Sequence, residues 1–217
     1  ASIFGEILTI FTAILASFVS PLNALQILWL NMLTDSIPAL ALGVDHNESD
    51  VMHEKPRETS ESFFAKGGMF WAVIYGIIIS LVSLCAFLYN PILYLIENGD
   101  TINLLSIKNT LLIPQIQIHS QTYAFITICF SQVFTSIAFK DISISIFKMK
   151  HLKNKVMLIA ILSAFALQII VVSIPIFNTI FTTTPLSLIE WLSLILFSSI
   201  PIWVHELVVM IKRNLYN

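Results

Sequence analysis

Charged side chains are scarce in this sequence. Its 217 residues include 11 Lys and Arg and 13 Asp and Glu, so 11% are charged, whereas a soluble domain has about 25%. Hydrophobic residues make up 57% of the chain. So few charges argue against a soluble enzyme, a disordered chain and a nucleic-acid-binding protein. The composition favours an integral membrane protein whose partner is the lipid bilayer, with no nucleic acid involved.

Cysteine, glycine and an initiator methionine are also lacking or few. The two cysteines, Cys85 and Cys129, both lie in apolar runs, so the sequence indicates no disulfide framework. No glycine-rich phosphate-binding loop is present. The chain opens at Ala1 in an apolar segment without a basic region before it, which is not a signal peptide. We therefore expect a piece of a longer protein.

Long apolar runs are abundant. A bilayer core about 30 Å thick needs about 20 apolar residues per helix. The runs are too long and too uniformly apolar for the alternating strands of a membrane barrel. The sequence thus predicts an all-α, polytopic membrane helix bundle with six transmembrane helices. The predicted spans are, approximately, residues 2–19, 22–42, 69–88, 122–139, 156–176 and 188–211.

The basic residues predict the orientation of this bundle. With six spans, ten of the eleven Lys and Arg fall on one side, in residues 43–66, in residues 140–155 and in the C-terminal tail. Lys108 falls on the other side. Basic residues concentrate in cytoplasmic loops, so we expect the C-terminus to be cytoplasmic. The even number of spans places the N-terminal end on the same side.

Two carboxylates lie inside predicted spans. A charged side chain at the bilayer centre costs about 2.5–3.5 kcal/mol on insertion scales, so Glu6 and Asp35 are candidate functional residues. The turn between the first two spans centres near Pro21, 15 residues after Glu6 and 14 residues before Asp35. At about 1.5 Å per residue, both carboxylates should lie at a similar depth, roughly 21–22 Å from the turn.

Further oxygen-bearing groups lie beside Asp35. Asn31 is four residues earlier, hence on the same helix face, and Thr34 adds a hydroxyl. Pro38 removes one backbone hydrogen bond and frees a carbonyl near Thr34, and such breaks at membrane depth are tolerated where they line a cavity. Oxygen ligands of this kind suit a hard cation such as Ca²⁺. The alternative stays open that Glu6 is protonated, Asn31 joins two helices and Pro38 only kinks its helix.

The remaining polar residues of the spans have simpler interpretations. Four are predicted to pack helices together: Ser131, Gln132, Thr135 and Gln168. Three near the ends of spans are predicted to lie at the membrane interface: Glu190, His205 and Glu206.

Residues 26–44 carry a specific resemblance. They contain Asn-x-x-Thr-Asp-x-x-Pro, formed by Asn31, Thr34, Asp35 and Pro38, and resemble the sixth transmembrane helix of P-type cation-transporting ATPases, most closely type II calcium pumps. Residues 2–7 resemble the fifth helix of that family. Residues 50–57 are similar to the stretch after the sixth helix, and residues 182–214 to the last two helices.

The resemblance covers essentially the whole chain, residues 1–217, and implies the C-terminal transmembrane domain of such a pump, helices five to ten. It implies Ca²⁺ as the transported ion, exported across a bacterial plasma membrane. Its ligands would be Asp35, Asn31, Thr34 and Glu6, with Asp35 in the centre. ATP and Mg²⁺ would bind only in the N-terminal half, the other partner besides lipid. This chain carries no catalytic or cofactor-binding residue and would not hydrolyse ATP alone.

Two positions depart from the family. Ile3 stands where the fifth helix has an Asn ligand, and Cys129 aligns with the eighth-helix Glu of calcium pumps that bind two ions. Both belong to one of the two ion sites, so the resemblance implies one cation per cycle. Glu6 would be a ligand, the carrier of a counter-transported proton, or a structural acid. The alternatives are a pump for Mn²⁺, Na⁺ or K⁺, a stand-alone six-helix channel or carrier, and a non-catalytic remnant.

Overall fold

The structure is a computed structural model that describes residues 1–34, 36–43, 68–138 and 155–215. Within these ranges every regular element is a helix, which confirms the predicted all-α class. In chain order the elements are α1 (Ser2–Leu15), α2 (Ala24–Trp29), the π-helix η1 (Leu30–Thr34), α3 (Ser36–Gly43), α4 (Gly68–Glu97), α5 (Leu104–Leu111), α6 (Pro114–Ala138), α7 (Lys155–Ser173), α8 (Pro175–Phe181), α9 (Leu188–Ser198) and α10 (Ile200–Leu215).

Some helices of this bundle are long enough to cross a membrane. In the described residues, Gly68–Glu97 and the stretch Leu188–Ile211 are long and apolar enough to cross a bilayer. A third candidate is the pair Met157–Ser173 and Pro175–Phe181, which is bent by 88°. The helix α1 is shorter, with 14 residues, and the second predicted span is divided into α2, η1 and α3. The count of six spans therefore stays a prediction.

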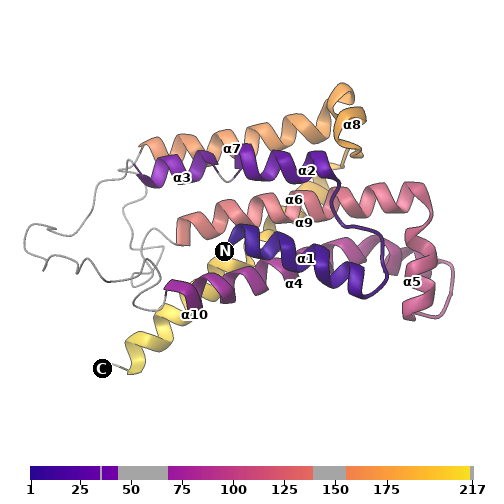
Figure 1. Cartoon of the computed structure of the whole chain (residues 1–217), viewed down its shortest axis with the longest axis horizontal. Coiled ribbons are helices and arrows are strands. Elements are labelled where there is room, and N and C mark those ends of the chain that lie inside the picture. The colour runs from indigo at the N-terminus through magenta and orange to yellow at the C-terminus, as the bar shows by residue number, and fades with distance from the viewer. Residues whose placement is uncertain (35, 44–67, 139–154, 216–217) are drawn as a thin grey trace, which may run out of the picture.

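The helix ends gather at two opposite ends of the bundle (Figure 1). The end of α3, the start of α4, the end of α6, the start of α7 and the end of α10 all lie at one end of the bundle (Figure 1). The short helices α5 and α8 lie at the opposite end (Figure 1). Lys108 is in the last turn of α5, so it lies at the end opposite Lys155, the first residue of α7.

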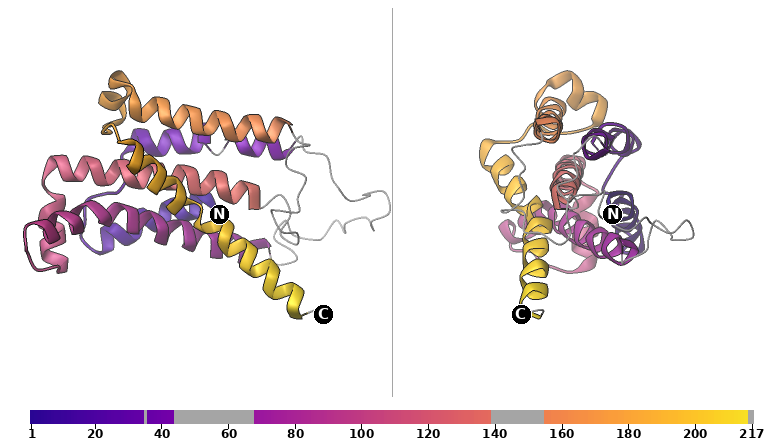
Figure 2. Two further views of the ribbon diagram at one scale, coloured as in Figure 1. Left: turned by 180° about the vertical axis from the view of Figure 1, so that it is seen from behind. Right: turned by 90° about the vertical axis from the view of Figure 1, so that its left-hand side faces the viewer.

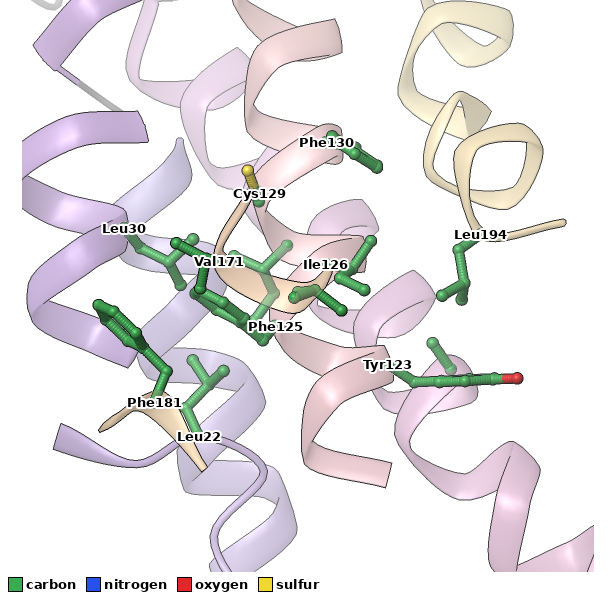
Figure 3. Packing of buried hydrophobic residues seen from close by; sticks show 13 residues of the cluster. Leu22, Leu30, Tyr123, Phe125, Ile126, Cys129, Phe130, Val171, Phe181 and Leu194 are labelled. Carbon is green, nitrogen blue, oxygen red and sulfur yellow. The ribbon is translucent and has the colours of Figure 1, made fainter. Parts of the chain in front are cut away.

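The helix α6 lies in the centre of the bundle. Seen along the bundle, α1, α2, α4, α7 and the α9–α10 pair surround it (Figure 2). All side chains from residue 120 to residue 133 are buried, and the largest apolar cluster collects around them, including Phe125, Phe130, Leu30 and Val171 (Figure 3). A polar side chain on this helix must therefore find its partner inside the protein, because water does not reach it.

Helix α2 begins at a local capping signal. The Asn23 side chain accepts from the Gln26 backbone N–H at 2.9 Å, and the Gln26 side chain accepts from the Asn23 N–H at 3.0 Å. This reciprocal capping satisfies two backbone donors that a helix start leaves open. The amides of Asn23 and Gln26 also donate to the carbonyl of Phe181 at 2.8 and 3.1 Å. The start of α2 is thus fixed to the end of α8.

Two glycines bring α1 directly onto α4. A Cβ added to Gly5 would lie 2.9 Å from Cγ2 of Ile79 and 3.2 Å from the carbonyl oxygen of Gly76. A Cβ on Gly76 would collide with the Phe4 ring. Only a residue without a side chain lets the two helices approach this closely. This contact positions the next residue on α1, Glu6.

Candidate cation site

Glu6 is a buried carboxylate that joins three helices. Its side chain is 3% exposed. One carboxylate oxygen accepts from Nε2 of Gln132 on α6 at 2.7 Å, and the other accepts from Nδ2 of Asn31 on η1 at 3.2 Å. The structure therefore brings together Glu6 and Asn31, two of the four residues that the sequence predicts as a cation site.

Asn31 lies in η1, where the second predicted span departs from a regular α-helix. Its Nδ2 also donates to the carbonyl of Ile27 at 3.0 Å. Its own carbonyl accepts from the Ser36 hydroxyl at 3.4 Å, across the interruption. π-helical turns are rare, and they occur frequently at functional sites. The Asn31 amide that donates to Glu6 thus belongs to an irregular stretch of backbone.

The interruption lies close to where the sequence predicts a break. Residues 30–34 are π-helical and the next α-helix begins at Ser36. Proline at position 38 cannot donate a backbone hydrogen bond to the carbonyl four residues earlier, which disturbs the helix there. The predicted ligand Asp35 lies outside the described residues, as do the side chains of Thr34 and Pro38. Their part in the site stays a prediction.

Gln132 is the site residue that sequence reasoning missed. We predicted it as a helix-packing group, and it does link helices, but its partner is the Glu6 carboxylate. Its Oε1 is buried without a hydrogen-bond partner in the described part of the chain. Cys129, which the resemblance placed at the eighth-helix position, lies in the apolar cluster with Leu30 (Figure 3). One available signal was that Gln132 is an amide in a long apolar run.

The identified hydrogen-bond donors of Glu6 carry no charge. Both identified donors to Glu6 are neutral amides, from Asn31 and Gln132. Among the residues that the structure describes, no three His, Cys, Asp or Glu side chains gather into a metal-binding group. A buried carboxylate is costly unless it is paired or neutralised, and the two amides supply part of the hydrogen bonding that Glu6 requires.

A second carboxylate, Glu190, is held differently. One of its oxygens accepts from the Ser187 N–H at 2.7 Å and from the Ser187 hydroxyl at 2.6 Å. The other accepts from the Tyr123 hydroxyl at 2.9 Å and lies 3.0 Å from Nε2 of His119. We call these four residues the Glu190 cluster. The side chains of His119 and Glu190 are 34% and 25% exposed, which agrees with the predicted interfacial position of Glu190.

The interfacial position of His205 stays a prediction, and the structure shows that its side chain is buried. It is 1% exposed, and its Nδ1 lies 3.1 Å from the hydroxyl of Tyr75 on α4. At this position α10 packs against α4, which supplies a polar partner for His205.

Comparison with known proteins identifies relatives of the chain. Residues 19–211 match the family described as "Cation transporting ATPase, C-terminus". The chain is 37% identical over 211 residues to "Calcium-transporting ATPase 1" of Bacillus cereus, covering 97% of this chain and 23% of that protein. It is 32% identical to "Calcium-transporting ATPase" of Bacillus subtilis, covering 93% and 20%. A human "Calcium-transporting ATPase type 2C member 1" is 26% identical, with 93% and 20% covered. The chain thus spans about a fifth to a quarter of these relatives.

Proposed function

Because the chain belongs to the family of cation-transporting ATPase C-termini, and resembles its type II calcium pumps, we propose that it forms the ion-translocating membrane part of an ATP-driven Ca²⁺ pump. One observation carries the proposal: a carboxylate that is 3% exposed, at the meeting point of three helices and beside a π-helical turn. The relatives named as calcium-transporting ATPases support Ca²⁺ as the ion.

We propose four ligands for this ion: Glu6, Asn31, Thr34 and Asp35. Ca²⁺ takes about six to eight oxygen ligands, and both carboxylates and amide oxygens serve. In the structure the Asn31 amide directs its NH₂ group to Glu6. To coordinate an ion, Asn31 would rotate and present its oxygen, while Asp35 would supply the central negative charge. Gln132 would keep Glu6 in place from the third helix.

The transport cycle follows from the cost of burying charge. When the ion leaves, carboxylates in an apolar bundle lose their neutralising partner. Protonation of Glu6 or Asp35 on the return step would offset this, which gives proton counter-transport with one Ca²⁺ per cycle. ATP and Mg²⁺ would act in the other, N-terminal half of the pump. Phosphorylation there would shift the membrane bundle between two states of different ion affinity.

The proposed setting is a bacterial plasma membrane. The six predicted spans would be helices five to ten of the pump, with the C-terminus in the cytoplasm. In support, the helix ends that border residues 44–67 and 139–154 lie at one end of the bundle together with the end of α10 (Figure 1). Basic residues concentrate in these segments of the sequence, as expected for a cytoplasmic side.

The test uses the full-length protein and phosphorylation from ATP. Asp35→Asn should abolish Ca²⁺-dependent phosphorylation, because the central charge is lost. Glu190→Gln is the matched control, since it also removes one carboxylate charge but outside the site. Normal Ca²⁺-dependent phosphorylation of Asp35→Asn would refute the assignment. Stimulation of the unmodified protein by Mn²⁺, Na⁺ or K⁺ but not Ca²⁺ would refute the choice of ion.

Glu6→Gln separates a ligand from a proton carrier. If Glu6 is a ligand, the variant should need more Ca²⁺ for half-maximal phosphorylation. If Glu6 only carries a proton, the variant should keep its Ca²⁺ affinity and lose Ca²⁺-driven proton movement in sealed vesicles.

A further inference from the structure

A pocket opens between α4, α6 and α9, on another side of the bundle from Glu6. It has a volume of 310 Å³, at the lower end of the roughly 300–1,000 Å³ typical of ligand sites. Its lining includes Cys85, Tyr89, Tyr123, Ser193, Leu194 and Phe197. Figure 3 shows Leu194 of α9 pointing towards the Tyr123 ring of α6, across the space between these helices.

Two walls of this pocket belong to candidate membrane spans, so the pocket would open to hydrocarbon. Two of its walls, α4 and α9, belong to the two stretches that are long and apolar enough to cross a bilayer. The same helices expose large apolar side chains, with Leu81 58%, Leu192 60% and Leu196 70% accessible. In a membrane protein such side chains face acyl chains. What reaches the mouth of the pocket is therefore lipid.

The chemistry of the lining suits an apolar ligand. The Tyr123 hydroxyl is occupied, since it donates to Glu190 at 2.9 Å. The Ser193 hydroxyl is also occupied, since it donates to the Glu190 carbonyl at 2.9 Å. A polar ligand would lose hydration here and gain few hydrogen bonds in return. A hydrocarbon tail that moves from the bilayer into the pocket gains free energy only through closer packing. A concave pocket provides such packing.

The pocket lies towards the end of the bundle that carries α5. Tyr123 is nine residues after the start of α6 at Pro114, or about 13 Å along the helix at about 1.5 Å per residue. The Glu190 cluster shares Tyr123 with the pocket, so a tail seated against this ring lies directly beside that cluster. A lipid whose tail enters here would have its headgroup near the partly exposed His119 and Glu190 side chains.

We propose that this pocket binds one acyl tail of a membrane phospholipid from the leaflet at the α5 end. The tail packs against the rings of Tyr89, Tyr123 and Phe197. The ring of Tyr123, and not its hydroxyl, forms the wall of the site, because the hydroxyl is engaged with Glu190. The site is separate from the proposed cation site, so tail binding does not require Ca²⁺.

The test uses the full-length protein in bilayers that contain phosphatidylglycerol with a photoreactive group on one tail. After illumination, cross-linked residues are identified by mass spectrometry. Cross-links should concentrate at residues 85–89 and 193–197. The comparison surface is α7, where Ile159 and Leu162 are 65% and 61% exposed and do not line this pocket. Equal labelling of both surfaces would overturn the proposal.

Variants sharpen this test. Cys85→Trp should fill the pocket and abolish the excess labelling of residues 193–197 over α7, because the indole ring takes the space that the tail needs. Leu162→Trp on α7 adds a similar ring at an exposed position and should leave this labelling unchanged. Tyr123→Phe keeps the ring and should also leave it unchanged. Unaltered labelling of Cys85→Trp contradicts the assignment.

The source of the tail is settled by a second probe. A free fatty acid with the same photoreactive group should label residues 193–197 less than the phospholipid does at equal membrane content. Labelling by the fatty acid alone would overturn the choice of a phospholipid.

Discussion

Glu6 and Glu190 are both anchored by hydrogen bonds in this bundle, but by different kinds of partner. Glu190 accepts from Ser187, three residues away, and from His119 and Tyr123 on α6. Glu6 accepts from two amides that are 25 and 126 residues distant in the chain. Glu190 thus completes a local cap at a partly exposed helix start, whereas Glu6 depends on three helices meeting.

The two carboxylates also differ in burial and in the groups around them. The charge of Glu190 faces His119 and a helix N-terminus, both of which favour an anion. The identified donors to Glu6 are neutral amides, and its side chain is almost completely buried. The proposed cation site is therefore at Glu6 and not at Glu190.

The largest expected effect compares removal of the two carboxylates. In the full-length protein, Glu6→Ala should raise the Ca²⁺ concentration for half-maximal ATP hydrolysis about 10–100-fold, since interactions with a charged group contribute about 1.5–3 kcal/mol. Glu190→Ala should leave this concentration within about twofold, because the Glu190 cluster does not contact the site. Equal shifts in the two variants would remove the distinction between the carboxylates.

The next effect concerns the amide that holds Glu6. Gln132→Leu keeps a similar volume but removes the donor at 2.7 Å. Leaving a buried charged acceptor short of a donor costs about 1–3 kcal/mol, so the apparent Ca²⁺ affinity should fall roughly 5–100-fold. The control is Gln168→Leu, which removes a buried amide that accepts from Trp29 at 3.3 Å on another face of the bundle. A greater loss of affinity in the control would contradict a role for Gln132 at Glu6.

A third effect tests whether Glu6 depends on the α1–α4 contact. Gly5→Ala should destabilise the protein by about 1–3 kcal/mol through overpacking, because the new methyl group meets Ile79 and the Gly76 backbone. A lower temperature of inactivation in detergent would report this. Gly43→Ala is the matched control, since nothing lies within 4 Å of a Cβ there. If both variants lose the same stability, the close packing of α1 on α4 is not important.

The smallest effect is expected at the local cap. Ser187→Ala removes the side chain that accepts from the Glu190 N–H and donates to its carboxylate. Loss of a helix cap costs about 1 kcal/mol. The inactivation temperature should fall slightly, while the Ca²⁺ dependence of ATP hydrolysis stays unchanged. A shift in Ca²⁺ dependence larger than that of Gln132→Leu would show that the two carboxylates are coupled.

Much of the candidate site could be predicted from the sequence because its signals are local. Glu6 is an acid in an apolar run, and Asn31 and Pro38 lie within eight residues of each other on the next run. The short turn between the runs implies that their side chains meet at similar depth. The contact between Glu6 and Asn31 agrees with this.

The contribution of α6 could not be predicted in the same way. Which residue of a helix faces a distant carboxylate depends on the rotation of that helix, and packing against several neighbours sets the rotation. In α6 it places Gln132 on Glu6 and Cys129 in the apolar cluster, one helical turn apart. Every side chain between residues 120 and 133 is buried, so no polar face of α6 signals its orientation.

Local chemistry in the sequence was sufficient for the helical class, for the apolar runs and for the acid Glu6 in the first of them, because each depends on residues close together in the chain. The tertiary structure alone decided that Gln132 donates a hydrogen bond to Glu6, that His205 is buried against Tyr75, and that a pocket remains between α4, α6 and α9. These features arise where side chains from distant segments fill a shared space, and the outcome depends on how all the helices pack at once.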